Sequence, residues 1–240
     1  MRGLLAAFGF LTRIPVPLRV FADPDARVRS LPWYPLVGLV LGLVLLVLAA
    51  ALAGAPPLLR GMLLLLAWVA LTGGMHLDGL ADSADAWVGG LGSRERTLAI
   101  MKDPACGPMG VLALVLVLGL KFTALASLGG GDWAVLLIAP MLARAAFVAA
   151  FLALPYVRTQ GLGSRLAEAP RGACLAALGA TAVACMLAGG WHGVLTLLAG
   201  ALVFVLWRRA CLARLGGMTG DLCGALGEIL ETVVLVAWCL

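Results

Sequence analysis

The stretch YPLVGLVLGLVLLVLAAALAG, residues 34–54, contains no charged residue. As a helix it would cross the hydrocarbon core of a bilayer, which requires about 20 apolar residues. The whole chain has 240 residues, of which 63% are hydrophobic and 12% are charged, with a mean hydropathy of +1.08. Because an ordinary soluble domain carries about 25% charged residues, the composition excludes that class of protein.

Further apolar runs of similar length follow along the chain. They cover residues 57–76, 110–129, 133–154, 173–190, 192–207 and, as a shorter run, 224–240. Several are rich in Gly and Ala, which allow helices to pack closely in lipid. The sequence therefore predicts an all-α fold, a polytopic integral membrane helical bundle of about seven transmembrane helices (six to eight). Residues 1–240 are expected to form a single membrane domain.

The N-terminal segment MRGLLAAFGFLTR, residues 1–13, does not have the pattern of a signal peptide. Its apolar run is short, Arg13 follows it directly, and no small-residue cleavage site comes next. Pro15 and Pro17 favour extended backbone after it. We expect an interfacial or re-entrant helix that these prolines end.

The basic residues, which give a formal net charge of +5, alternate along the chain. Five arginines precede the first span, and the second, fourth and sixth connections carry three basic residues each. The first connection has only Arg60, and the third and fifth have none. The positive-inside rule then places the N-terminus and the even-numbered connections in the cytoplasm, as in a multi-pass protein of the bacterial inner membrane. The charge is thus explained by topology and gives no support for nucleic-acid binding.

Three of the twelve acidic residues fall within HLDGLADSADAW, residues 76–87. If this segment is helical, Asp78, Asp82 and Asp85 lie within an arc of about 60° on one face. Like charges at this spacing repel one another, whereas a bridging cation would stabilise them. Carboxylate oxygens suit Mg²⁺ or Mn²⁺. We predict a metal site here, and the alternative is a solvated helix end.

A second acidic group lies in GGMTGDLCGALGEILE, residues 216–231. Asp221 and Glu228 are seven residues apart on one helical face, and Glu231 follows one turn later. Carboxylates at the edge of the hydrocarbon usually serve a site or pair with cations. Since the topology places this group on the cytoplasmic side as well, we predict that the two acidic groups converge on one metal site.

The connection GSRERTLAIMKDPACGPMG, residues 92–110, lies between the two acidic groups in the sequence. Gly107 and Gly110 permit a tight backbone whose amides could hold a phosphate, with Lys102 and Asp103 close by. The alternative is an ordinary glycine turn.

Lys121 and Arg144 fall well inside predicted spans, where an unpaired charge costs several kcal/mol. Each should face the bundle interior and find a partner, either a bound substrate or another helix. His76 either orients the acidic motif or is a packed, hydrogen-bonded histidine. The six cysteines form no CxxC pair and predict neither a zinc site nor a disulfide.

A carboxylate-bound divalent ion near basic side chains and glycine turns suits phosphoryl transfer. The ion neutralises a diphosphate and its leaving group, and a carboxylate can accept the proton of an attacking hydroxyl. The sequence has no GxSxG, Walker A or HExxH motif, so the corresponding chemistries have no support.

Long sequence motifs occur along nearly the whole chain. They are FLTRIPVP at 10–17, YPLVGLVLG at 34–42, TGGMHLDGLADSADAW at 72–87, RERTLAIMKDPACGPMG at 94–110, RTQGLG at 158–163 and GGMTGDLCGALGEILE at 216–231. With these motifs the chain resembles the cobalamin synthase family, the adenosylcobinamide-GDP ribazoletransferases. The combination of HLDGLAD-x-x-D with GG-x-TGD-x-x-GA-x-x-E is highly specific.

The resemblance implies an Mg²⁺-dependent integral membrane enzyme. Its reaction joins adenosylcobinamide-GDP to α-ribazole, or to α-ribazole 5′-phosphate, and gives adenosylcobalamin, or its 5′-phosphate, and GMP. The motif aspartates that it carries over are Asp78, Asp82, Asp85, Asp103 and Asp221. The chain departs from the pattern of many members at Pro104–Cys106, which leaves the phosphate contacts of these three residues in question.

The predicted site combines carboxylates of both acidic groups with basic side chains and a glycine turn. The expected metal ligands are Asp78, Asp82, Asp85, Asp221 and Glu228. Asp221 is a further ligand or the base, and Asp85 is the competing base. Lys102 and Arg158 balance phosphate charge, alone or with the turn from Gly161 to Gly163. The site is expected at the cytoplasmic face, built from residues 76–110, 158–163 and 216–231.

Two other functions remain open at this stage. A membrane phosphotransferase that acts on a lipid alcohol would use the same metal chemistry, although the CDP-alcohol phosphotransferase pattern is only partly matched, by Asp78-Gly79. A cation transporter would explain intramembrane charges, but it predicts carboxylates near the bilayer midplane. Membrane lipids are expected partners, and a second copy of the chain, in a homo-oligomer, is a further candidate.

Overall fold

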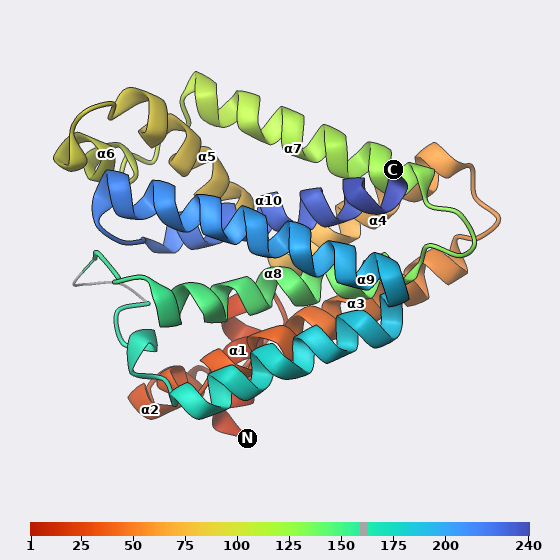
Figure 1. Cartoon of the computed structure of the whole chain (residues 1–240), viewed down its shortest axis with the longest axis horizontal. Coiled ribbons are helices and arrows are strands. Elements are labelled where there is room, and N and C mark those ends of the chain that lie inside the picture. The colour runs from red at the N-terminus through yellow and green to blue at the C-terminus, as the bar shows by residue number, and fades with distance from the viewer. Residues whose placement is uncertain (159–162) are drawn as a thin grey trace.

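The computed structural model describes residues 1–158 and 163–240, and it is a bundle of helices (Figure 1). The α-helices are α1 (Arg2–Leu11), α2 (Pro24–Val28), α3 (Tyr34–Ala51), α4 (Pro57–Thr72), α5 (Met75–Gly89), α6 (Arg94–Ile100), α7 (Pro108–Ser127), α8 (Ala134–Ala153), α9 (Arg171–Leu215) and α10 (Gly220–Cys239). Short 3-10 helices are η1 (Leu18–Val20), η2 (Leu31–Trp33) and η3 (Leu166–Glu168). Within these described ranges no strand forms, and the all-α prediction is confirmed.

Five helical segments are long and apolar enough to cross a membrane, and the bent pair α4–α5 would make a sixth. One of the five is α9, whose 45 residues include a non-helical residue, Gly190, with φ 53° and ψ −127°. The chain reverses there, since Gly193 packs against the carbonyl of Cys185 and the second leg of α9 runs back along the bundle (Figure 1). When the two legs are counted separately, the total is the predicted seven.

The centre of the bundle is formed by α8 and α10, most of whose residues are buried. Glycines on α3 allow its backbone to touch α8. A Cβ at Gly42 would lie 2.5 Å from the carbonyl oxygen of Leu136. Such close approach is typical of helices in lipid. Leu and Val side chains on α3, α7 and α9 are exposed and form an apolar outer surface.

A sharp break separates α5, which carries the aspartates, from the second predicted span. The sequence did not predict a break here, but α4 ends at Thr72 and the axis bends by 89° before α5. Gly73 and Gly74 form the break with φ values of 68° and 71°, which a side chain would disfavour. The backbone N–H of Arg13 donates to the carbonyl of Leu71 at 2.7 Å, and so satisfies one of the carbonyl groups at the end of α4.

The N-terminal helix α1 ends earlier than predicted. It stops at Leu11, because Thr12 already has an extended backbone with φ −142°, so the prolines follow the end and do not cause it. With 10 residues α1 is too short to cross a bilayer. Its interfacial placement stays a prediction.

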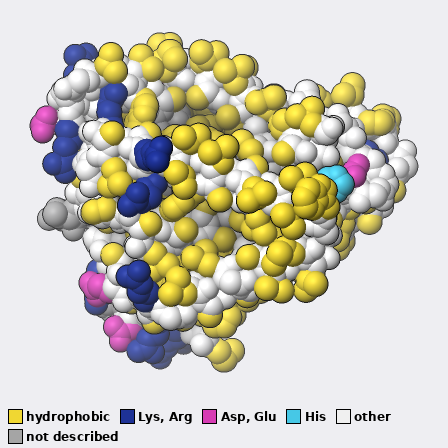
Figure 2. Space-filling view, in the orientation of Figure 1, with side chains coloured by type: hydrophobic (Ala, Val, Ile, Leu, Met, Phe, Trp, Pro, Cys, Tyr) yellow, Lys and Arg dark blue, Asp and Glu magenta, His cyan; other side chains and the backbone are white. Residues whose placement is uncertain are grey.

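Charged side chains gather at one end of the molecule, and a broad apolar surface covers the middle (Figure 2). This end carries α2, α5 and α6, and the connections from α8 to α9 and from α9 to α10 also lie there (Figure 1). The basic connections are therefore together in space, as their alternation along the sequence predicted. The first and third connections lie at the opposite end.

Candidate active site

Helix α5 presents its three aspartates along one side, as the spacing predicted. Asp78 is in the first turn of α5 and exposed, whereas Asp82 and Asp85 are half-buried. Small residues between them let other backbone approach. A Cβ at Gly79 would lie 2.8 Å from the carbonyl oxygen of Asp221, so α5 and α10 touch at this point.

Asp221 enters the site through the first turn of α10. The side chain of Thr219 caps this helix by accepting a hydrogen bond from the amide of Leu222 at 3.3 Å. Because of this cap α10 begins at Gly220, four residues before the predicted start of the last span. Asp221 therefore lies on the helix and not in a loop before it.

The aspartates share one electrostatic environment. Asp82 interacts with the negative charges of Asp78, Asp221 and Asp85 and with a single positive charge, that of Arg158. The structure thus brings Asp221 of the second acidic group close to the three aspartates of α5. The excess of negative charge would be relieved by a bound cation.

Arg158 links three segments of the site. Its Nη2 lies 2.7 Å from Oδ2 of Asp221 and donates to the carbonyl of Met101 at 3.2 Å. Its Nε is buried and has no partner among the described residues. Arg158 would face a ligand with its positive charge if Asp221 released it.

A short backbone pairing places Arg158 against α10. The amide of Val157 donates to the carbonyl of Met218 at 2.9 Å, and the amide of Met218 donates to the carbonyl of Pro155 at 2.9 Å. Tyr156 is the residue between Pro155 and Val157. Burial raises the pKa of its phenol, which stays neutral. No sequence pattern marks Tyr156, whereas Thr219 could have been found as a Thr that precedes a helical pattern.

Asp85 makes contacts that the sequence did not predict. Its carboxylate accepts the amides of Gly107 at 2.7 Å, Gly110 at 2.9 Å and Met109 at 3.1 Å. These bonds occupy most of the acceptor positions of a carboxylate. The amides of Gly107 and Gly110 hold Asp85 and not a phosphate, so the prediction of a phosphate cradle there is wrong. Asp85 fixes the start of α7 to α5.

The other predicted substrate-binding residues are placed in different ways. Lys102 and Asp103 are exposed beside the site, and Asp103 accepts the amide of Ala105 at 3.0 Å. Gly163 is buried, and a Cβ there would lie 2.8 Å from the ring of Tyr156, so it packs tightly. Gly161 lies outside the described residues. Substrate binding by Lys102, Asp103 and Arg158 stays a prediction.

Glu228 does not belong to the aspartate site. It lies two helical turns from Asp221, about 10 Å along α10. Its Oε2 is 2.5 Å from Nζ of Lys121, which is also 2.5 Å from Oε2 of Glu231. Arg144 pairs with Glu231 as well. The prediction of Glu228 as a metal ligand is therefore corrected: buried cations balance it. Lys121 and Arg144 find partners on another helix, one of the two predicted outcomes.

The donor chemistry of the aspartate site fits Mg²⁺, which prefers a few carboxylates and keeps water or phosphate as further ligands. Asp78, Asp82 and Asp221 offer only oxygen donors, are partly exposed, and repel one another. Across residues 1–158 and 163–240, no three acidic, His or Cys side chains are already gathered as a metal site. Metal binding thus requires these side chains to turn, and it stays a prediction.

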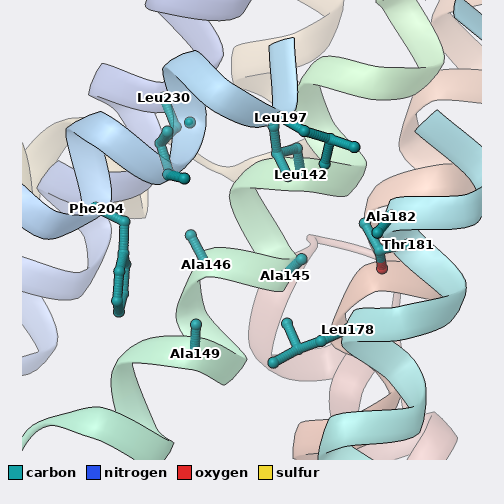
Figure 3. A pocket seen from close by; sticks show the side chains of 12 residues that line it. Leu142, Ala145, Ala146, Ala149, Leu178, Thr181, Ala182, Leu197, Phe204 and Leu230 are labelled. Carbon is teal, nitrogen blue, oxygen red and sulfur yellow. The ribbon is translucent and has the colours of Figure 1, made fainter. Parts of the chain in front are cut away.

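Two apolar cavities open elsewhere on the bundle. One of about 250 Å³ lies between α8, both legs of α9 and α10, and Leu142, Leu178, Leu197, Phe204 and Leu230 project into it (Figure 3). The other, of about 530 Å³, lies between η2, α3, α8 and the first leg of α9. Neither is lined by a charged side chain. They do not add to the chemistry of the aspartates.

Comparisons with known proteins give a consistent match. A family model described as cobalamin-5-phosphate synthase matches residues 3–239. A protein from Pseudomonas aeruginosa named adenosylcobinamide-GDP ribazoletransferase is 52% identical over 238 residues, 99% of this chain and 97% of that protein. Proteins of the same name from Pseudomonas savastanoi pv. phaseolicola (52% over 232 residues, 96% of each chain) and Stutzerimonas stutzeri (52% over 238 residues, 98% and 97%) are similar. No solved structure matches the chain.

Proposed function

The chain belongs to the cobalamin-5-phosphate synthase family, and on this premise we propose that it is an adenosylcobinamide-GDP ribazoletransferase. It joins adenosylcobinamide-GDP to α-ribazole, or to α-ribazole 5′-phosphate, and releases GMP. The product is adenosylcobalamin or its 5′-phosphate. The observation that carries the proposal is the 52% identity over nearly the full length of proteins with that name.

In the proposed reaction, the 3′-hydroxyl of the ribazole attacks the phosphorus on the cobinamide side of the diphosphate. The bond from that phosphorus to the oxygen of GMP breaks, and GMP leaves. Asp221 is the better candidate than Asp85 to accept the hydroxyl proton, because three amides already occupy the Asp85 carboxylate. Arg158 is placed to exchange Asp221 for a diphosphate oxygen, which would free the carboxylate.

Asp78 and Asp82 are the residues that would hold Mg²⁺, with Asp221 as a further ligand through the carboxylate oxygen that does not accept the proton. When bound, the ion supplies positive charge that neutralises the diphosphate and the leaving group. The chain itself contributes the placement: α5 and α10 touch at Gly79, and Arg158 ties Asp221 to the connection before α7.

The site is proposed to face the cytoplasm of a bacterium, from the inner membrane, with the N-terminus on the same side. The support is the alternation of basic connections and their gathering at the end of the bundle that holds α5 (Figure 2). A site at this end would receive a nucleotide substrate from the cytoplasm directly. Glu228 and Glu231 pair with buried cations, which argues against an ion pathway through the bundle.

The test of this function is substrate choice. Purified protein in lipid nanodiscs is given adenosylcobinamide-GDP with α-ribazole, or the same GDP derivative with diacylglycerol as the alcohol, and GMP is measured by chromatography. We expect GMP and a corrinoid nucleotide only with α-ribazole. GMP release with diacylglycerol alone would replace the proposal by the lipid-alcohol transferase.

A further inference from the structure

A continuous series of buried polar contacts runs from the middle of the bundle to the first turn of α5. It begins at Lys121 on α7, passes through Glu231 on α10 and Arg144 on α8, and reaches His76. Nδ1 of His76 lies 3.4 Å from Nη2 of Arg144. Each of these side chains is at least 92% buried. His76 stands two residues before Asp78, so the series ends at the aspartate helix.

The direction of α5 is not set by the helix before it. Gly73 and Gly74 separate the two with a bend of 89°, and backbone of this kind can hinge. The first turn of α5 contacts the rest of the bundle through the side chain and the backbone of His76. Its ring packs edge-on against Phe147 with centroids 5.1 Å apart, and a Cβ at Gly224 would lie 3.2 Å from its Cα.

We propose that His76 is a positioning residue for the transfer reaction. Held by Arg144 and Glu231, it fixes the direction of α5 and thereby the place of Asp78 and Asp82 relative to Asp221. This inference rests on the proposed function. The effect on rate is large because a displacement of about 1 Å in a catalytic arrangement can cost about 100-fold.

Stability alone gives a weaker account of the same contacts. Buried ion pairs are often no more stabilising than apolar side chains of similar volume, because desolvation offsets their attraction. Three helices nevertheless contribute charges to one connected series, and its last charged member, Arg144, faces the histidine. A fixed geometry at the start of α5 is what this arrangement provides and an apolar core would not.

The test compares two substitutions of His76. His76→Phe keeps an aromatic ring against Phe147 but removes the nitrogen that faces Arg144, and His76→Asn keeps an acceptor near the Nδ1 position. We expect His76→Phe to lower kcat for GMP release about 10–100-fold with KM unchanged, a loss of the size found for residues that orient metal ligands. His76→Asn should recover most of kcat. A purely structural histidine would show no such split between Asn and Phe at temperatures where both variants are folded.

The matched control is His192→Phe, the same change in the other histidine, which is exposed on the second leg of α9 and packs on Trp238. It should leave kcat unchanged. Thermal unfolding of each variant checks that the comparison is made on folded protein.

A second readout does not depend on turnover. Cys106 is exposed beside the loop that Asp85 holds, and Cys239 is the other exposed cysteine of the described chain. In a Cys239→Ser background, the rate of maleimide labelling at Cys106 reports how α5 holds that loop. His76→Phe should change this rate and His76→Asn should not.

Wild-type kcat together with wild-type labelling in His76→Phe would overturn the inference. If wild-type protein releases no GMP, the proposed function fails, and the labelling rate alone decides the inference.

Discussion

Replacing Asp82 by Asn should lower kcat for GMP release by more than about 100-fold, while the protein remains folded in the membrane. Loss of a residue that merely supports a metal ligand costs about 10–100-fold, and a direct ligand should cost more. Asp82 is the carboxylate that interacts with three others at the site. Its neutralisation also removes repulsion, so the midpoint of thermal unfolding should stay the same or rise. Both quantities are measured on purified protein in nanodiscs.

The control for this variant is Asp25→Asn. Asp25 lies at the same end of the molecule, is exposed, and pairs only weakly with Arg29 at 3.6 Å. An exposed ion pair contributes about 0–1 kcal/mol, so neither turnover nor unfolding should change. An Asp82→Asn enzyme with the wild-type kcat would remove Asp82 from the site.

Replacing Glu231 by Gln should cause a large loss of stability. Glu231 pairs with both Lys121 and Arg144, and its side chain is 1% exposed. Breaking a buried pair leaves uncompensated charge and costs about 3–5 kcal/mol. The expected result is a clearly lower midpoint of thermal unfolding, or a failure to accumulate in the membrane.

Two further variants separate the effect of Glu231→Gln from that of removing any carboxylate. Glu168→Gln makes the same chemical change in an exposed pair with Arg165, and it should leave the midpoint unchanged. Glu228→Gln should lower the midpoint but leave the Mg²⁺ concentration for half-maximal activity unaltered. A shift in that concentration would return Glu228 to the metal site, and a wild-type midpoint in Glu231→Gln would show that the buried ions do not support the bundle.

Local features of the site could be predicted because they depend on spacing within one segment. Asp78, Asp82 and Asp85 lie along one side of α5 because four- and three-residue steps return to the same face of a helix. The turn at Gly190 falls at the end of the predicted span 173–190, where a pair of glycines interrupts the apolar pattern. The long apolar helices and the gathering of basic connections follow from the same kind of local pattern.

The contacts that a carboxylate makes with other helices could not be predicted in the same way. Asp221 and Glu228 share a face of α10, but Asp221 lies beside α5 at the charged end, whereas Glu228 lies two turns deeper, opposite Lys121 on α7. Which carboxylate meets a cation depends on how deep each helix is placed against its neighbours. Asp85 illustrates the same point, because its partners are amides at the start of α7 that the sequence assigned to a phosphate.

The bend between α4 and α5 could not be predicted, because glycine can adopt both helical and left-handed backbone angles. The segment TGGMHLDGL could extend a helix if its glycines took helical angles, but Gly73 and Gly74 take left-handed angles, which glycine adopts as readily as helical ones. Arg13 then caps the end of α4 from another part of the chain.

The dependence of GMP release on free Mg²⁺ tests the central claim most directly. Initial rates are measured with adenosylcobinamide-GDP and α-ribazole in excess EDTA, and then as free Mg²⁺ is raised. If Asp78, Asp82 and Asp221 hold a divalent ion that makes the diphosphate open to attack, release is absent in EDTA and returns with Mg²⁺. Equal rates of GMP release in EDTA and in Mg²⁺ would contradict the account.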